Sequence, residues 1–326
     1  MVLIKVSFPD EEELLAEKSF RTYKNYLKSI ELIIESLYGP DLFRNIKSAL
    51  EKGSPISNTT QAASYDINKI KKLLFNAWYT EIILSLPNLF DSSLKFYSNH
   101  WAPVQAYYSV YLSLRSLIEA SGVSCREDHT NTLNLIASWI KNDSFFLAPW
   151  NAYCKGCVEY ENHKFYCLPN GYTVNEISPL TNPAVENMWD FYSLMLKTTR
   201  DRILKKRKAE WKRKNNRKRM VKTEIFALDK NVHPTTIFDS LYRLRIRSNY
   251  EDADAFMMGT QTSQDAENYH KALTTVTSTT LFMIESYIAQ LLGKDNFKNL
   301  VDEFKKRDSV KQSEKTIKAR ADIILA

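Results

Sequence analysis

Glycine is scarce in this sequence, with 7 among 326 residues. That is about 2% of the chain, against a usual level of about 7%. Tight β-hairpin turns depend on glycine, because glycine adopts positive φ angles without a steric cost. The scarcity therefore argues against an all-β fold. With 44% hydrophobic residues, the chain still has enough apolar material for a substantial core.

The sequence also lacks a long apolar run and an export signal. The most apolar stretch, 73–90, is interrupted by Glu81 and Pro87 and cannot supply about 18 consecutive apolar residues. The first residues contain no basic segment followed by an apolar run and a small-residue cleavage site. We therefore expect no membrane partner and a cytoplasmic location.

Cysteine is also sparse, but three of the four cysteines are clustered. Cys154, Cys157, His163 and Cys167 follow the spacing Cys-x2-Cys-x5-His-x3-Cys. Thiolates and imidazoles are the ligands that bind structural zinc tetrahedrally. The spacing is close to that of a zinc knuckle, Cys-x2-Cys-x4-His-x4-Cys, without being identical. The pattern predicts a closed structural zinc site; the alternative is three buried thiols and an unrelated histidine.

Positive charge is concentrated in one segment. Residues 197–222 contain fourteen lysines and arginines and two acids, a local net charge of +12, whereas the whole chain carries +7. Such a density attracts a polyphosphate, and an aromatic ring can stack on a base. We call residues 205–222 the basic arm and predict that it binds nucleic acid without reading its sequence. The residues expected to contact RNA are Lys205, Lys206, Arg207, Lys208, Trp211, Lys212, Arg213, Lys214, Arg217, Lys218 and Arg219. The alternative is a solvated segment that keeps the protein soluble.

Apolar spacing of three and four residues recurs along most of the chain and predicts an all-α fold. Helices are expected over about 10–38, 41–52, 66–86, 103–121, 129–141, 184–204, 235–258 and 265–292, with one or two more after Asp295. Asp10 is expected to cap the first helix, 53–61 to form a loop, and Gly259 to end the helix from 235. Residues 142–183 look irregular, and the basic arm is expected to project into solvent.

Three arginines alternate in the segment LYRLRIRSNYEDADAF, which spans 241–256. On a helix, Arg243, Arg247 and Tyr250 lie on one polar side, and Arg245 points elsewhere. Guanidinium groups offer paired donors in a fixed fork, so this face is suited to a phosphate.

Ordinary ion pairs are the alternative explanation for these arginines. Asp239 precedes Arg243 by four residues, and Arg247 precedes Glu251 by four. Pairs at this spacing are common on exposed helix faces.

Two pairs of segments resemble the HEPN superfamily of helical proteins. WAPVQAYYSVYLSLRSLIEASG with HTNTLNLIASWI resembles its opening helix pair, and LYRLRIRSNYEDADAF with the helix from Asp265 resembles its closing pair. The resemblance implies a four-helix up-and-down bundle, a homodimer formed through that bundle, and RNA as the partner. Many HEPN proteins are metal-independent endoribonucleases of toxin–antitoxin or antiviral defence systems.

The catalytic HEPN motif is an arginine, four to six residues, and then a histidine. One branch adds a tyrosine two residues later. In this sequence Arg243, Ser248 and Tyr250 reproduce that spacing with serine in place of histidine. Serine does not titrate near neutrality and cannot replace the histidine as a proton-transfer group. His233 and His270 are the nearest histidines in sequence, and His129 is expected to be structural.

The sequence thus predicts four regions: an N-terminal helical region at 1–97, a HEPN-like bundle at 98–141 plus 232–293, an insertion at 142–231, and a C-terminal helical tail at 294–326. The expected function is an RNA-binding HEPN-type effector of a defence or toxin system. If the protein is an enzyme, it is expected to be an endoribonuclease that needs no metal cofactor. Arg243, Arg247 and Tyr250 would then hold the scissile phosphate. A non-catalytic HEPN-like interaction or regulatory subunit is the alternative, and DNA is an alternative nucleic acid.

Overall fold

A computed structural model describes residues 11–52, 65–89, 92–143, 146–157, 161–251, 253–257, 262–307 and 314–326. The α-helices are α1 (Glu11–Tyr38), α2 (Leu42–Lys52), α3 (Ile67–Ser85), α4 (Ser92–Ser98), α5 (Ala102–Ala120), α6 (His129–Asp143), α7 (Met188–Lys214), α8 (Lys222–Asn231), α9 (Ile237–Ile246), α10 (Ala253–Met257), α11 (Ser263–Leu292), α12 (Lys294–Arg307) and α13 (Ala319–Leu325). A 3₁₀ turn covers Leu86–Leu89, and π-helical turns cover Arg247–Glu251 and Glu314–Lys318. The strands are β1 (Tyr153–Cys157), β2 (Glu161–Tyr166) and β3 (Thr235–Thr236).

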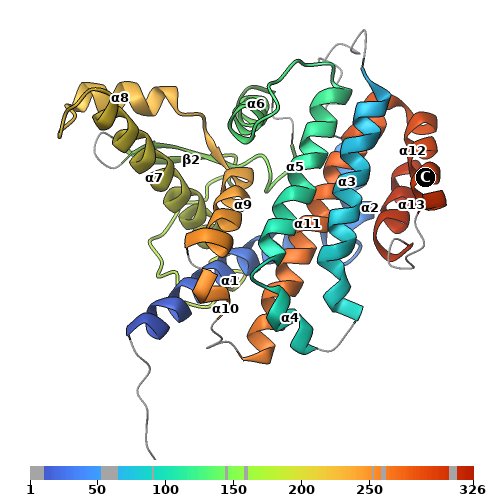
Figure 1. The fold of residues 1–326 in the computed structure, drawn as a ribbon, viewed down its shortest axis with the longest axis horizontal. Helices are drawn as coiled ribbons and strands as arrows, with labels where there is room; N and C mark the ends of the chain where they lie inside the picture. The colour runs from blue at the N-terminus through green and yellow to red at the C-terminus, as the bar shows by residue number, and fades with distance from the viewer. Residues whose placement is uncertain are drawn as a thin grey trace, which may run out of the picture.

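The long helix α11 forms the centre of the structure. It packs against α5 on one side and α1 on another, and α3 lies beside α5 (Figure 1). Residues on every side of α11 are buried, among them Tyr269, Val276, Phe282 and Ile288. A helix that is apolar over most of its circumference has to be enclosed by other helices. Its enclosure by α1, α4, α5 and α12 organises the core.

The fold is mainly α-helical, and the helices expected from apolar spacing are present, except that the one expected over 235–258 is divided. Helix α1 ends at Gly39, whose φ of +64° is the left-handed conformation that favours glycine after a helix. Asp66 caps α3 by accepting hydrogen bonds from the backbone N–H groups of Asn68 and Lys69. The expected cap at Asp10, the loop at 53–61 and the helix end at Gly259 lie outside the described residues.

The expectation that residues 142–183 are irregular was wrong for part of this segment. Strands β1 and β2 form an antiparallel hairpin, and β3 pairs with the other edge of β1 in the order β2-β1-β3. Gly156, with φ of +87°, lies where the β1–β2 register shifts. The strands are short and one is bulged, so no sustained alternation in the sequence marked them.

The helix expected over 235–258 is divided in the structure. Helix α9 ends at Ile246, a π-helical turn follows at Arg247–Glu251, and α10 begins at Ala253. A π-turn spaces hydrogen-bonded residues by five instead of four. Side chains after Arg247 therefore depart from the four-residue spacing on which the predicted polar face depended.

The helices assigned to the N-terminal region and to the HEPN-like bundle share one core. Helix α3 packs along α5, and α1 packs along α11 and α7. Their buried side chains, such as Ile30, Trp78, Leu114 and Ile284, belong to a single apolar cluster.

A buried ion network joins the C-terminal helix α13 to this core. The guanidinium of Arg320 donates to the carboxylates of Glu81 on α3 (2.7 Å) and Glu285 on α11 (2.8 and 2.9 Å). Trp78 Nε1 also donates to Glu285, at 2.7 Å. Arg320 is 0% exposed, so neither carboxylate can be compensated by water if the arginine is lost.

We predict that Arg320→Ala lowers the free energy of unfolding by about 3 to 5 kcal/mol, because it leaves two buried carboxylates without their cation. Urea denaturation of the full chain measures this loss. Arg307→Ala is the control, since Arg307 pairs with Glu303 at 2.6 Å on the surface and should contribute about 1 kcal/mol or less. Equal losses in the two variants would contradict the prediction.

Candidate functional site

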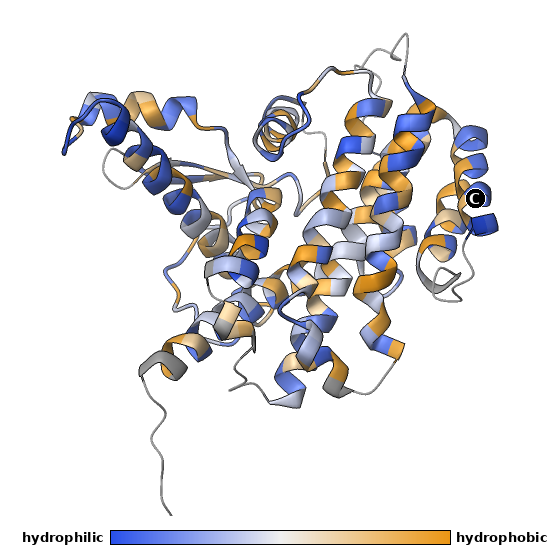
Figure 2. Cartoon of the chain, in the orientation of Figure 1, coloured by the Kyte–Doolittle hydropathy of each residue, from blue (hydrophilic) through white to orange (hydrophobic). Residues whose placement is uncertain are grey.

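The basic arm extends from the rest of the structure as the last turns of α7 and the connection to α8 (Figure 1). In Figure 2 the outer part of α7 and its connection to α8 have mostly the blue colour of hydrophilic residues. Helix α8 has no buried residue. Within the arm, the exposed basic residues that form no ion pair with any other described residue are Lys205, Lys206, Lys212, Arg213, Lys214, Lys218, Arg219 and Lys222. Their charges are free to act on an external polyanion.

Other side chains of the basic arm contact one another. The guanidinium of Arg217 lies 5.1 Å from the centroid of the Trp211 ring and pairs with Glu224 at 2.5 Å. Arg207 pairs with Glu210 at 3.3 Å. Of the residues expected to contact RNA, Arg207 and Arg217 therefore also have partners within the arm.

Arg200 anchors the base of the arm. This arginine of α7 is 1% exposed and donates to the Asp229 carboxylate on α8 at 2.6 Å. It also donates to the backbone carbonyls of His233 and of Gly156 on β1. One buried guanidinium thus ties α7, α8 and the small sheet together, and it fixes the direction in which the arm leaves the core.

The predicted zinc ligands lie on the hairpin and just after it. Cys154 and Cys157 are buried on β1, on the two sides of the bulge at Gly156, whereas Cys167 is exposed. His163 on β2 directs Nε2 toward Asp201 Oδ1 on α7, at 2.8 Å. Within the described residues, no group of three or more histidine, cysteine or acidic side chains is arranged to hold a metal ion. The structure therefore does not bring the four predicted ligands together.

The arginines of α9 point toward different neighbours. Arg243 is half-buried and donates to the hydroxyls of Thr198 (3.0 Å) and Thr199 (3.4 Å) on α7. Tyr250 is 67% exposed. Ser248, in the position of the HEPN histidine, is 0% exposed, and its hydroxyl donates to the Arg245 carbonyl. The serine therefore faces the protein interior.

The Asp239 carboxylate does not pair with Arg243. It accepts hydrogen bonds from the backbone N–H and the hydroxyl of Thr236, at the start of α9. Its other oxygen lies 2.7 Å from His233 Nε2. His233 is therefore directed at the start of α9, and Arg243 is left with the two threonine hydroxyls of α7.

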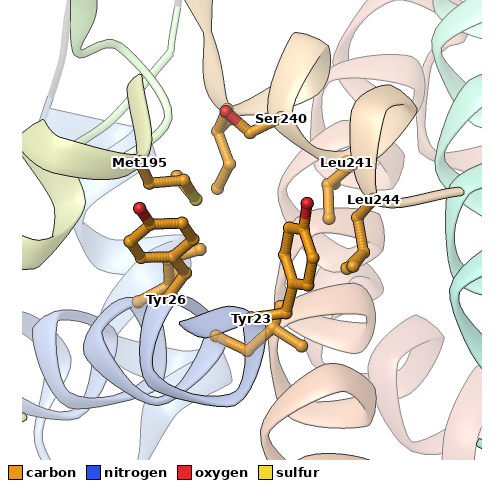
Figure 3. A pocket seen from close by; sticks show the side chains of 9 residues that line it. Tyr23, Tyr26, Met195, Ser240, Leu241 and Leu244 are labelled. Atoms are coloured by element: carbon orange, nitrogen blue, oxygen red, sulfur yellow. The ribbon is translucent and has the colours of Figure 1, made fainter. Parts of the chain in front are cut away.

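A small cavity lies between α1, α7 and α9 (Figure 3). Its lining includes Tyr23, Tyr26, Met195 and Leu244, and its volume is about 20 Å³. That is room for about one water molecule. The cavity is therefore too small to hold a nucleotide.

His270, the second candidate base, is buried in α11. Its Nδ1 lies 3.1 Å from the Asn99 side-chain oxygen. Burial, together with the nearby charge of Lys95, lowers the pKa of His270 to about 4. The imidazole is therefore neutral at pH 7, and it shares no hydrogen-bond partner with Arg243.

Sequence reasoning missed one group of side chains, in which His129 meets Arg245. His129 lies among tyrosines of α5 and α9, and Arg245 contacts two of these tyrosines. The available signal was the close spacing of Tyr107, Tyr108 and Tyr111, which we interpreted only as an apolar helix face. Which helix this face meets could not be read from the spacing.

Comparison with protein-family models, curated proteins and solved structures gives no match for this chain. The likeness to the HEPN superfamily therefore remains a prediction from sequence. Among the helices that the structure describes, none has the length and apolarity needed to cross a membrane.

We predict that His270 makes the stability of the protein depend on pH between about 6.5 and about 4. The unfolded chain binds a proton to this imidazole in that window, whereas the folded chain does not, so stability falls as the pH falls. The loss should approach about 3 kcal/mol at the low end.

Urea denaturation at pH 7 and pH 4.5 tests this prediction when the native chain is compared with His270→Gln. The carboxylates titrate in both proteins. The difference between the two proteins in how the free energy of unfolding changes with pH is therefore the contribution of His270. An identical pH dependence in both would show that His270 does not contribute.

Proposed function

We propose that this protein binds RNA through its basic arm. The observation that supports the proposal is the local net charge of +12 over residues 197–222. The structure adds that many of these basic side chains are exposed and lack an ion pair among the described residues. Binding of this kind is driven by phosphate neutralisation and counterion release, so it does not depend on base sequence.

The anchorage of the arm supports the same proposal. Arg200 holds the base of α7 against α8 and β1, so the charged end extends from a fixed position. A preorganised array of charges loses less conformational freedom on binding than a flexible tail does. The exposed part of the Trp211 ring would add stacking on a base.

The resemblance to HEPN proteins extends the proposal to an effector of a defence or toxin system that cleaves RNA without a metal. In this form Arg243, Arg247 and Tyr250 contact the scissile phosphate, and the chain acts as a homodimer. The general base would have to come from outside the motif position, since Ser248 occupies it and faces inward.

A non-catalytic interaction or regulatory subunit is the second candidate. It is favoured by Ser248 and by the surroundings of the two histidines nearest in sequence. His233 bonds to Asp239, and His270 is buried beside Asn99. Among the described residues, neither ring has a hydrogen bond to Arg243 or to the two threonines that Arg243 contacts.

Neutralising three exposed charges of the arm should weaken RNA binding. For the triple variant Lys212→Gln, Arg213→Gln, Lys218→Gln we expect the Kd for a single-stranded RNA to rise about tenfold or more. We also expect the slope of log K against log salt to fall by about 2, because each lost phosphate contact on a single strand removes about 0.7 from it. Fluorescence anisotropy at several salt concentrations measures both quantities.

A matched control removes the same charge elsewhere. Lys52, Lys298 and Lys306 are exposed lysines of α2 and α12, and changing all three to glutamine should leave the affinity near that of the native chain. Equal losses in both triples would mean that net charge alone governs binding and would contradict the role of the arm. Tighter binding of duplex DNA than of RNA would identify DNA as the partner.

Cleavage of RNA in excess EDTA separates the two candidate functions. Cutting by the native chain, lost in Arg243→Ala, Arg247→Ala, would support the endoribonuclease. RNA binding without cutting by either protein would support the non-catalytic subunit. Zinc remains a prediction from the spacing of Cys154, Cys157, His163 and Cys167, and metal analysis of the purified protein tests it.

A further inference from the structure

Three helices bring six polar and aromatic side chains together at the surface. Tyr107, Tyr108 and Tyr111 come from α5, His129 is the first residue of α6, and Tyr242 and Arg245 come from α9. We call this group the His129–Arg245 cluster. Tyr107 is buried, and the other five side chains are half-buried. Part of each of these five is therefore accessible to a ligand.

The His129 imidazole is held from several sides. Its Nδ1 lies 2.8 Å from the Tyr107 hydroxyl, its centroid lies 4.4 Å from that of Tyr111, and it stacks on Tyr242 at 5.3 Å. The segment before it is fixed as well, because Asp128 accepts a hydrogen bond from the backbone N–H of Asn131. Burial and the charge of Arg245 lower the pKa of His129, so the ring is neutral at pH 7 and does not repel a cation beside it.

Arg245 brings a positive charge that no carboxylate balances among the described residues. Its Nη2 donates to the Tyr108 hydroxyl at 3.0 Å, and its guanidinium carbon lies 5.1 Å from the centroid of the Tyr108 ring and 5.8 Å from that of Tyr242. In the described part of the chain Arg245 forms no ion pair, and its buried Nε, like that of Arg243, has no hydrogen-bond partner.

Three buried arginines show what is missing at the half-buried Arg245. Arg115 lies 3.6 Å from Glu127, Arg200 2.6 Å from Asp229, and Arg320 2.8 Å from Glu285. A guanidinium that is partly removed from water is stabilised by an anion. Arg243 also lacks an ion pair among the described residues, but two threonine hydroxyls accept its hydrogen bonds. Arg245 is therefore the cation of the cluster that a bound anion would complete.

The chemistry of the cluster fits a ligand that is both anionic and planar. A guanidinium fork binds phosphate oxygens, and tyrosine rings stack on nucleobases. The Tyr108 hydroxyl, which accepts a hydrogen bond from Arg245, adds a polar group beside the guanidinium. Figure 1 places α6, α9 and the base of the basic arm on the same side of α5, so a strand captured by the arm has this surface near it.

From these contacts we infer that the His129–Arg245 cluster binds one nucleotide unit, with the phosphate on Arg245 and the base against the tyrosine rings. That this nucleotide belongs to an RNA strand rests on the proposed function. The affinity of the cluster for a free nucleotide does not depend on the proposed function.

Isothermal titration of the full chain with AMP, UMP and inorganic phosphate tests the site itself. We expect both nucleotides to bind more tightly than phosphate, because only they offer a base. Arg245→Gln should weaken nucleotide binding about tenfold to a hundredfold, the usual range for losing a charge-assisted hydrogen bond. Tyr108→Phe, which keeps the ring but removes the hydroxyl that orients Arg245, should weaken it severalfold.

Two controls carry the same chemical changes at distant positions. Arg44→Gln on α2 and Tyr97→Phe on α4 alter exposed side chains and should leave nucleotide binding unchanged. Thermal unfolding of each variant identifies one that has lost its fold. If Arg245→Gln does so, Arg245→Lys keeps the charge without the fork and, with Tyr108→Phe, decides the outcome.

The arm variant Lys212→Gln, Arg213→Gln, Lys218→Gln separates this inference from the proposed function. We expect it to bind AMP like the native chain while binding RNA weakly. AMP binding without any RNA binding by the native chain would support the cluster as a site for free nucleotides and would overturn the proposed function.

Competition identifies the source of the nucleotide. Displacement of a short oligoribonucleotide by AMP from the native chain would place a unit of the strand in the cluster. No binding of either nucleotide at millimolar concentration, or binding that Arg245→Gln leaves unchanged, would overturn the inference. The cluster would then serve only to pack α6 and α9 against α5.

Discussion

The burial of α11 is the constraint on which the rest of the structure depends. This helix has apolar side chains around most of its circumference, so α1, α4, α5 and α12 have to surround it. Burying it also buries Glu285, whose charge would be costly without a cation. Arg320 supplies that cation from the far end of the chain and compensates Glu81 as well. The C-terminal helix is therefore part of the core.

The basic arm projects from this core, and a second buried arginine, Arg200, attaches its base to the core. Arg200 satisfies carbonyls of β1 and of the segment before β3, and it pairs with Asp229 on α8. The small sheet and α8 are thereby fastened to α7 at the base of the arm. Beyond Leu204 the side chains are mostly exposed, and their mutual repulsion is relieved by solvent or by a polyanion.

Arg243 and Arg245, which alternate in the sequence of α9, contact two different helices. Residues two apart on a helix differ in direction by about 200°, so Arg243 and Arg245 cannot face the same neighbour. Arg243 reaches the threonines of α7, and Arg245 reaches the tyrosines of α5. The first contact joins α9 to the base of the arm. The second leaves a guanidinium without an anion beside a neutral histidine, the one place in the described structure where these groups meet.

Most helix positions could be predicted from the sequence, because a helix is determined by spacing and capping within a few residues. The end of α1 at Gly39 and the cap of α3 at Asp66 are of this kind. The exposed charge of the basic arm could also be predicted from consecutive residues of the sequence. Only the tertiary structure decided the β-hairpin, the π-turn after Arg247 and the partners of the site residues. His129 of α6 and Arg245 of α9, 116 residues apart in the chain, both contact Tyr108 and Tyr242. Pairings of this kind depend on how separate helices pack, and spacing along one helix does not contain that information.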